Sequence, residues 1–274
     1  MRIDERLVTA RTLLFVPGHR PDRFAKAAGS GADVIILDLE DAVAPRYKQQ
    51  ARDNVAHYLE KAGPVIVRVN AAGTPWHDAD LAMLGERTCA VMLPKAEEPH
   101  LVERLTARLR RGTSIVPLLE TAAGVLRAPA LCACRGVVRA AFGSLDLAAQ
   151  LDVDPADHDA LRHARSVIVL ASAASGLPGP IDGVTTTVTD DRAVRADAEH
   201  GRRLGFAAKM CVHPTQLAPV RAVFSPSPKQ QEWARAVLAA ADGSASVLDG
   251  QMIDQPVVVR ARRLLEMPTE GELP

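Results

Sequence analysis

The segment VIILDLEDAV, residues 34–43, joins an apolar run directly to a group of carboxylates. Its first three residues are β-branched, as a buried strand favours. The acidic residues that follow are Asp38, Glu40 and Asp41. Burying three carboxylates costs free energy unless their charges are paired. The segment therefore predicts a buried strand that ends at a site rich in positive charge.

The same alternation recurs along most of the chain. Short apolar runs are each followed by a longer, charged and alanine-rich segment typical of a helix. The runs cover residues 11–17, 33–40, 64–70, 89–95, 113–120, 136–143, 179–184 and 207–214. Strands that alternate with helices predict parallel βαβ units, and eight units predict a (β/α)8 TIM barrel. The run at 179–184 gives the weakest strand signal.

A doubly wound open sheet is the alternative fold for this alternation. Such sheets often carry a GxGxxG motif after the first strand, and no such motif follows residues 11–17. The barrel is therefore the favoured prediction.

The sequence pattern changes after the eighth run. Residues 224–230, FSPSPKQ, are rich in proline and serine and predict a linker. Two helical stretches follow, separated by a short segment. We expect a barrel catalytic domain over residues 1–223 and a C-terminal linker and helical arm over residues 224–274. The arm would either cap its own barrel as a lid or pack on a neighbouring subunit.

Composition excludes several classes of protein. Basic and acidic residues number 33 each, so no excess charge indicates nucleic acid or an anionic membrane as a partner. The apolar runs are too short to span a bilayer, and the N-terminus does not have the pattern of a signal peptide. The cysteines are expected to be reduced core thiols, which predicts a cytoplasmic protein. They are Cys89, Cys132, Cys134 and Cys211.

Polar residues end most of the predicted strands. In a (β/α)8 barrel these ends meet, and the active site lies there. The residues are Asp38, Glu40, Asp41, Arg68, Lys95, Glu120, Asp146 and His213. Carboxylate oxygens from different strands suit a hard divalent cation such as Mg²⁺. An arginine beside them suits a substrate carboxylate or an oxygen that gains negative charge.

The residue types alone leave simpler interpretations open. Glu120 and Asp146 could each serve the start of a helix. Arg68 could be a structural ion-pair partner of the acids that follow residue 37. His213, just before a proline, could be an ordinary loop histidine.

Taken together and in order, eight segments resemble the β subunit of citrate lyase and the acyl-CoA lyases of the HpcH/HpaI aldolase superfamily. They are LLFVPGHRPDRFAKA, DVIILDLEDAVAPRYKQQAR, VRVNAAGT, VMLPKAE, LLETAAGV, AFGSLDLAAQL, CVHPTQLAPV and DGQMIDQPVV. The resemblance implies a (β/α)8 barrel that forms a homo-oligomer, a trimer or hexamer. It also implies a need for Mg²⁺, with Mn²⁺ as a substitute.

The resemblance further implies roles for single residues. Glu120 and Asp146 would hold the metal, and Glu120 would also lie beside the substrate. Arg68 would bind the substrate and stabilise an enolate. Asp254, delivered from the arm of a neighbouring subunit, would act as acid or base.

Two more groups of residues are assigned by the same resemblance. One group would hold the nucleotide and phosphates of coenzyme A, and consists of Phe15, Arg20 and Lys26. The other would reach the metal through water, and consists of Asp38, Glu40 and Asp41.

The expected reaction is cleavage or formation of a carbon–carbon bond beside a thioester. A 3-hydroxyacyl thioester of the citryl-CoA or malyl-CoA type would give an oxo-acid and an acyl-CoA. Three alternatives stay open for the same site: an acyl-CoA thioesterase, a malate-synthase-like activity and a non-catalytic subunit that binds an acyl thioester. A carrier protein could also replace coenzyme A as the partner.

Overall fold

The structure is a computed structural model of the 274-residue chain that describes residues 3–241, 246–248 and 250–266. The chain divides into two compact units, residues 1–220 and 221–274.

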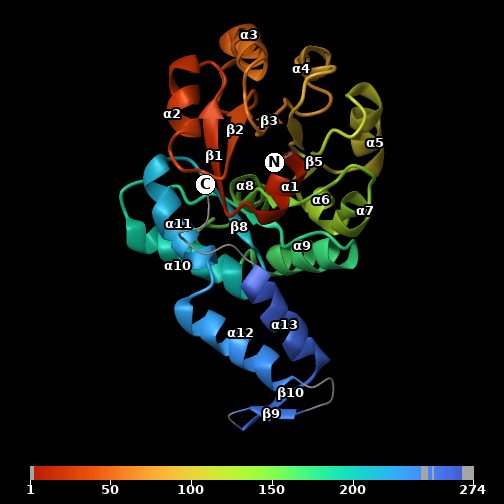
Figure 1. The fold of residues 1–274 in the computed structure, drawn as a ribbon. Coiled ribbons are helices and arrows are strands. Elements are labelled where there is room, and N and C mark those ends of the chain that lie inside the picture. Colours follow the sequence, from red (N-terminus) through yellow and green to blue (C-terminus); the bar gives the residue numbers. More distant parts are fainter. Residues whose placement is uncertain (1–2, 242–245, 249, 267–274) are drawn as a thin grey trace. The chain divides into compact units, whose positions relative to one another are not determined.

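The first unit is a closed barrel of eight parallel strands (Figure 1). The strands pair in chain order, and the last pairs with the first. They are β1 (Thr12–Pro17), β2 (Val34–Asp38), β3 (Val65–Arg68), β4 (Ala90–Leu93), β5 (Ile115–Leu119), β6 (Ala141–Phe142), β7 (Ile181–Asp182) and β8 (Ala208–Cys211). Closure confirms the predicted TIM barrel and excludes the open sheet.

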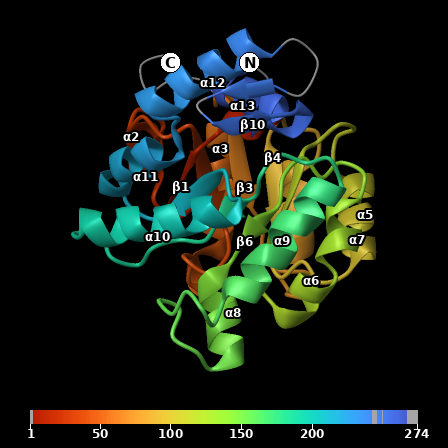
Figure 2. The same ribbon diagram turned by 90° about the horizontal axis from the view of Figure 1, so that it is seen from below.

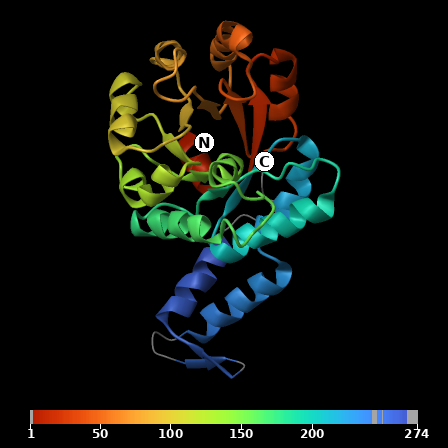
Figure 3. The same cartoon turned by 180° about the vertical axis from the view of Figure 1, so that it is seen from behind.

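Helices surround the strands of this unit (Figures 2 and 3). They are α2 (Phe24–Ala28), α3 (Lys48–Leu59), α4 (His77–Leu84), α5 (Pro99–Arg108), α6 (Ala122–Leu126), α7 (Ala128–Cys132), α8 (Ser144–Leu151), α9 (Arg162–Ala174) and α10 (Asp191–Leu204). The boundary between the two units falls within α11 (Leu217–Phe224). A further helix, α1 (Ile3–Thr9), precedes β1. No helix in the described part of the chain is long and apolar enough to cross a membrane.

Two strands are shorter than the sequence predicts. The run at 136–143 pairs as β6 only at Ala141 and Phe142, because Gly136 has a φ of 90°, outside the range of a strand. The run at 179–184 forms β7 only at Ile181 and Asp182. The weakest strand of the prediction is therefore present but brief.

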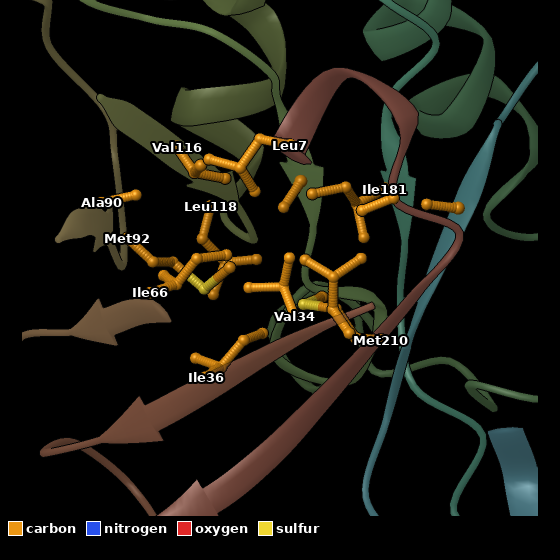
Figure 4. Close-up of a cluster of buried hydrophobic side chains, with 14 residues drawn as sticks. Leu7, Val34, Ile36, Ile66, Ala90, Met92, Val116, Leu118, Ile181 and Met210 are labelled. Carbon is orange, nitrogen blue, oxygen red and sulfur yellow. The ribbon is translucent and has the colours of Figure 1, made fainter. Parts of the chain in front are cut away.

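The barrel interior is filled by apolar side chains that point toward one another (Figure 4). Val34 and Ile36 of β2, Ile66 of β3, and Val116 and Leu118 of β5 belong to this core. Leu7 of α1 joins them, so the helix before the first strand completes the core. The four cysteines are free thiols, and all but Cys134 are buried.

The second unit contains two helices, α12 (Pro228–Ala240) and α13 (Gln255–Glu266), which share a small apolar core. The predicted linker is shorter than residues 224–230, since α11 ends at Phe224 and α12 begins at Pro228. The Ser227 hydroxyl caps α12 by accepting a hydrogen bond from the Gln230 N–H (3.2 Å). The predicted packing of this region on a neighbouring subunit stays a prediction.

An antiparallel hairpin between these helices was not predicted. It pairs β9 (Ser246–Leu248) with β10 (Gln251–Ile253). The dipeptide Asp-Gly at residues 249–250 is a common signal for a two-residue hairpin turn. The flanking strands are only three residues long, too short to show the alternation by which a strand is recognised in the sequence.

Candidate active site

The alternation of side chains along a strand determines which polar residues reach the barrel mouth. Side chains two residues apart lie on the same face of a strand. Ile36, Ile66 and Leu118 point into the barrel core. Asp38, Arg68 and Glu120 each lie two positions further on and continue the inward face at the carboxyl ends of β2, β3 and β5.

A cavity of about 740 Å³ lies at these carboxyl ends. Residues predicted for the site form part of its wall: Phe15, Lys26, Asp38, Asp41, Arg68, Glu120, Asp146 and His213. Its volume lies in the range of sites for small molecules and cofactors. The structure therefore brings most of the predicted site residues to one cavity.

Arg68 is held in one orientation by Asp38. Its Nε and Nη2 atoms donate hydrogen bonds to the two carboxylate oxygens of Asp38, at 2.7 and 2.8 Å. Asp38 also accepts hydrogen bonds from the backbone N–H groups of Glu40 and Ala42. Such a bidentate pair holds the guanidinium plane in one orientation. The Nη1 atom takes no part in the Asp38 pair.

Burial and charge act in opposite directions on this pair. Burial alone would raise the pKa of Asp38, but the charge and hydrogen bonds of Arg68 hold it below its usual value. Burial would lower the pKa of Arg68, and Asp38 raises it above the usual value instead. Both groups are therefore charged at neutral pH, although Arg68 is only 8% exposed.

The other two acids of the opening segment lie around the same guanidinium. Glu40 Oε2 is 3.2 Å from Arg68 Nη1, and Asp41 Oδ2 is 3.6 Å from it. Glu40 Oε1 accepts a hydrogen bond from Lys95 Nζ at 2.8 Å. The positive charge that this acidic segment needs is thus supplied by Arg68 and Lys95. A water-mediated contact between these acids and a metal stays a prediction.

Glu120 is a buried carboxylate (1% exposed) at the end of β5. Its Oε1 atom accepts a hydrogen bond from the backbone N–H of Lys95 (2.8 Å). Burial, together with the negative charges of Glu40 and Asp146, raises the pKa of Glu120 to about 8. Thr121, not Glu120, caps the helix that follows.

Asp146 lies in the first turn of α8 and faces the same cavity as Glu120. The repulsion between the two carboxylates is what a bound cation would relieve. Within the described residues, no group of three His, Cys, Asp or Glu side chains could hold a metal together. A cation here would have two carboxylate ligands from the protein and keep several waters, as Mg²⁺ does in many sites. The two residues fit the predicted metal in this respect.

The residues predicted to contact coenzyme A are only partly together. Phe15 and Lys26 line the cavity, and the Arg68 Cζ atom lies 4.8 Å from the centre of the Phe15 ring. Arg20 instead pairs with Asp22 through Nε and Nη2, at 3.0 and 2.8 Å. Arg23, which the sequence pattern did not single out, lines the cavity beside Lys26.

Two of the predicted polar side chains accept hydrogen bonds from backbone N–H groups close to them in the sequence. His213 lines the cavity and caps the short helix at Pro214–Gln216, where its Nδ1 atom accepts from the Thr215 N–H. Asp254, in the second unit, directly precedes α13 and accepts a hydrogen bond from the Val257 N–H (3.3 Å). The predicted catalytic role of Asp254 stays a prediction.

The family model described as HpcH/HpaI aldolase/citrate lyase matches residues 11–214. A citrate lyase subunit beta-like protein of Mycobacterium tuberculosis is 38% identical, over 94% of this chain and 95% of its own. A (3S)-malyl-CoA thioesterase of Cereibacter sphaeroides is 35% identical, over 93% of each chain.

Among solved structures, protein CitE of Mycobacterium tuberculosis in complex with magnesium, acetoacetate and coenzyme A matches with a TM-score of 0.83. It is 36% identical, and the match covers 94% of this chain and 98% of that one.

Proposed function

The chain belongs to the HpcH/HpaI aldolase/citrate lyase family, and from that premise we propose that it is a Mg²⁺-dependent carbon–carbon lyase. Its substrate would be a 3-hydroxyacyl thioester of the citryl-CoA or malyl-CoA type, and its products an oxo-acid and an acyl-CoA. The same site would catalyse the reverse condensation.

One observation carries the proposal. Glu120 and Asp146, two carboxylates that form no ion pair with a side chain in the described part of the chain, line the same cavity as the fixed guanidinium of Arg68. A metal ion and an arginine side by side suit an oxo-acid, whose oxygens need positive charge from both sides. The crystallised relative that holds magnesium, acetoacetate and coenzyme A supports this choice of ligands.

Glu120 and Asp146 would hold the metal through their carboxylate oxygens. Mg²⁺ bound there would supply a Lewis acid and a template for the oxygens of the oxo-acid. The Lys95 N–H orients Glu120 by its hydrogen bond to Oε1, and Oε2 is then available as a ligand. Orientation of ligands by hydrogen bonds of this kind strengthens metal sites.

Arg68 would stabilise the negative charge that develops when the carbon–carbon bond breaks. A base takes the proton of the 3-hydroxyl group, and cleavage then leaves an oxo-acid and a thioester enolate. The enolate oxygen needs a fixed hydrogen-bond donor. Nε and Nη2 of Arg68 are hydrogen-bonded to Asp38, whereas Nη1 lies beside Glu40 and Asp41 without a hydrogen bond to Glu40 Oε2. Nη1 is therefore the atom of Arg68 that can donate to the enolate oxygen. Protonation of the enolate carbon requires an acid, and we assign that step to Asp254 of a neighbouring copy.

The thioester portion would extend along the wall formed by Phe15, Arg23 and Lys26. The two basic side chains suit the phosphates of coenzyme A, and the phenyl ring offers apolar surface to its pantetheine arm. The neutral overall charge of the chain fits a small-molecule partner.

A thioesterase activity at the same site is the second candidate, because the relative from Cereibacter sphaeroides carries that name. Water would then attack the thioester carbonyl, and the carbon–carbon bond would stay intact. The same metal ligands and arginine would be needed.

Product analysis separates the two activities. The protein is incubated with malyl-CoA or citramalyl-CoA and Mg²⁺, the oxo-acid is measured as its phenylhydrazone, and free thiol is measured with a disulfide reagent. A lyase releases glyoxylate or pyruvate and an intact acyl-CoA, without free thiol. Free thiol without an oxo-acid would contradict the lyase and support the thioesterase.

A further inference from the structure

Lys95 has an unusual backbone conformation for a residue with a side chain. Its φ angle is 48°, in the left-handed region, which Lys95 and Asp152 alone share among the non-glycine residues that the structure describes. Glycine occupies this region at least cost, because a Cβ atom crowds the neighbouring carbonyl there. A lysine at such a position indicates that its side chain has a use.

The backbone of this turn is held from both sides. The Ala96 N–H donates to the Leu118 carbonyl at 3.3 Å. The Ala96 carbonyl lies against Gly124, where a Cβ atom would stand only 2.4 Å from the oxygen. Strained conformations persist where their surroundings fix them in this way.

In this conformation the backbone N–H and the ammonium of Lys95 bind two different carboxylates. The backbone N–H donates to Glu120 Oε1 and the ammonium donates to Glu40 Oε1, both at 2.8 Å. Any residue except proline, glycine included, could supply the N–H. The contact with Glu40 is therefore the part that requires lysine.

The Glu40 carboxylate stands next to the arginine donor that the substrate needs. Its Oε2 atom is buried without a hydrogen bond, 3.2 Å from Arg68 Nη1. Without the ammonium of Lys95, Glu40 would be free to turn both oxygens toward that nitrogen. An anionic substrate oxygen would then compete with two carboxylate oxygens for this donor, where it now meets only one oxygen of Glu40.

We propose that Lys95 is a positioning residue whose ammonium holds Glu40 Oε1 away from Arg68. Glu40 then faces the Nη1 donor through Oε2 alone, at 3.2 Å and without a hydrogen bond, and Nη1 can still bind an anionic oxygen of the substrate. The inference rests on the proposed function, since it assigns Arg68 Nη1 to substrate. It gives Lys95 a role through Glu40 and Arg68, with no covalent step of its own.

The proposal predicts opposite effects on cation and anion binding. A variant without the ammonium has less positive charge near the metal ligands and keeps the N–H that orients Glu120. Its affinity for Mn²⁺ is expected to stay equal or rise, whereas its affinity for an oxo-acid falls about tenfold or more. A purely structural role would weaken both.

The test uses Lys95→Gly and, as a second variant suited to the left-handed region, Lys95→Asn. Mn²⁺ binding is measured from the resonance of free Mn²⁺, and binding of glyoxylate, pyruvate and oxaloacetate to the Mn²⁺-loaded protein by calorimetry. Lys61→Gly, at an exposed turn, is the matched control for loss of a lysine. Circular dichroism establishes that each variant is folded.

A double variant isolates the role of Glu40. Adding Glu40→Gln to Lys95→Gly removes the competing charge and is expected to restore most of the oxo-acid affinity. Unchanged oxo-acid binding in both Lys95 variants, or equal losses for Mn²⁺ and oxo-acid, would overturn the inference. A wild-type protein that binds Mn²⁺ but none of the oxo-acids would instead overturn the proposed function on which it rests.

Discussion

Gly143, just after β6, lies against the carboxylate of Glu120, at the end of β5. A Cβ atom at Gly143 would stand 2.4 Å from the Glu120 Cβ and 2.5 Å from Glu120 Oε2. Real Cβ atoms do not make contacts this short. Any residue other than glycine at position 143 would therefore displace the Glu120 side chain. The proposed metal ligand is therefore held by Lys95 N–H on one oxygen and by the space at Gly143 beside the other.

Gly143→Ala is expected to displace the Glu120 side chain and to weaken Mn²⁺ binding by about tenfold or more, as loss of a supporting contact does in metal sites. Titration of the folded variant with Mn²⁺ measures the effect. Gly63→Ala is the matched control, because a Cβ at Gly63 meets no atom within 4 Å. Equal Mn²⁺ affinities in the two variants would contradict the assignment of Glu120 as a ligand.

Glu120→Gln and Asp146→Asn are each expected to abolish metal-dependent turnover while the fold stays intact. Two protein ligands leave little to spare, so either change should weaken Mg²⁺ strongly. Without metal, Glu120→Gln should be as stable as the wild type or more so, because burial and like charges disfavour the ionised Glu120 carboxylate. Thermal unfolding measures stability without metal and the binding of Mg²⁺, which should raise the Tm of the wild type and not of the variants. Turnover is measured by release of the oxo-acid.

Arg68→Lys is expected to lose about 3 kcal/mol of transition-state stabilisation, as when an oxyanion donor is removed. Lysine keeps the charge but lacks the planar group that binds both oxygens of Asp38. Measurement of kcat/KM with the substrate identified by product analysis tests this. A value near that of the wild type would show that Arg68 has a structural role only.

A stacked pair of histidines, one of them buried, predicts how stability depends on pH. His200 is buried, and its ring stacks on His158 with centroids 3.9 Å apart. Burial, together with the charges of His158 and Arg165, lowers the pKa of His200 to about 4. The unfolded chain binds this proton at about pH 6.5. The free energy of unfolding should therefore fall as the pH drops from about 6.5 to about 4.

Urea unfolding between pH 4 and 7 measures this loss. His200→Gln should flatten the pH dependence in that window, and His163→Gln, at an exposed position of α9, should not. A wild-type slope that survives in His200→Gln would show that other groups cause it. Asp197, whose pKa is lowered to about 2 despite burial by its pair with Lys209, contributes only at lower pH.

The fold and the outline of the site can be predicted from two regularities of the sequence. Side chains alternate between the two faces of a strand, and the strand–helix unit repeats eight times. Ile36 and Asp38 illustrate why: an inward apolar residue and a polar residue two positions later need only the regular geometry of a strand. The carboxyl ends of eight parallel strands then meet by closure of the barrel. Arg68 and Glu120 can be placed together in this way from the sequence alone, and Asp146 follows the next strand in the first turn of α8.

The features that the sequence did not predict depend on contacts between distant segments. Gly143 has meaning only beside Glu120, and the left-handed turn of Lys95 depends on Ala96 and Gly124 around it. The pairing of Asp38 with Arg68 was one of two open interpretations, because residue types do not give distances. Neither propensity nor spacing carries such information.

The last prediction concerns Asp254, which the resemblance assigns as an acid supplied by a neighbouring subunit. One oxygen of its side chain accepts a hydrogen bond from the Val257 N–H, and the other can carry a proton. We expect a homo-oligomer, trimeric or hexameric, whose active sites are completed between copies.

Subunit exchange tests this expectation for Asp254. Asp254→Ala and Glu120→Ala should each be inactive. Hybrids of the two should regain partial activity, because some sites combine an intact metal centre from one copy with an intact acid from another. Light scattering and mass spectrometry verify the hybrids. Verified hybrids that stay inactive, or a fully active monomer, would contradict the shared site.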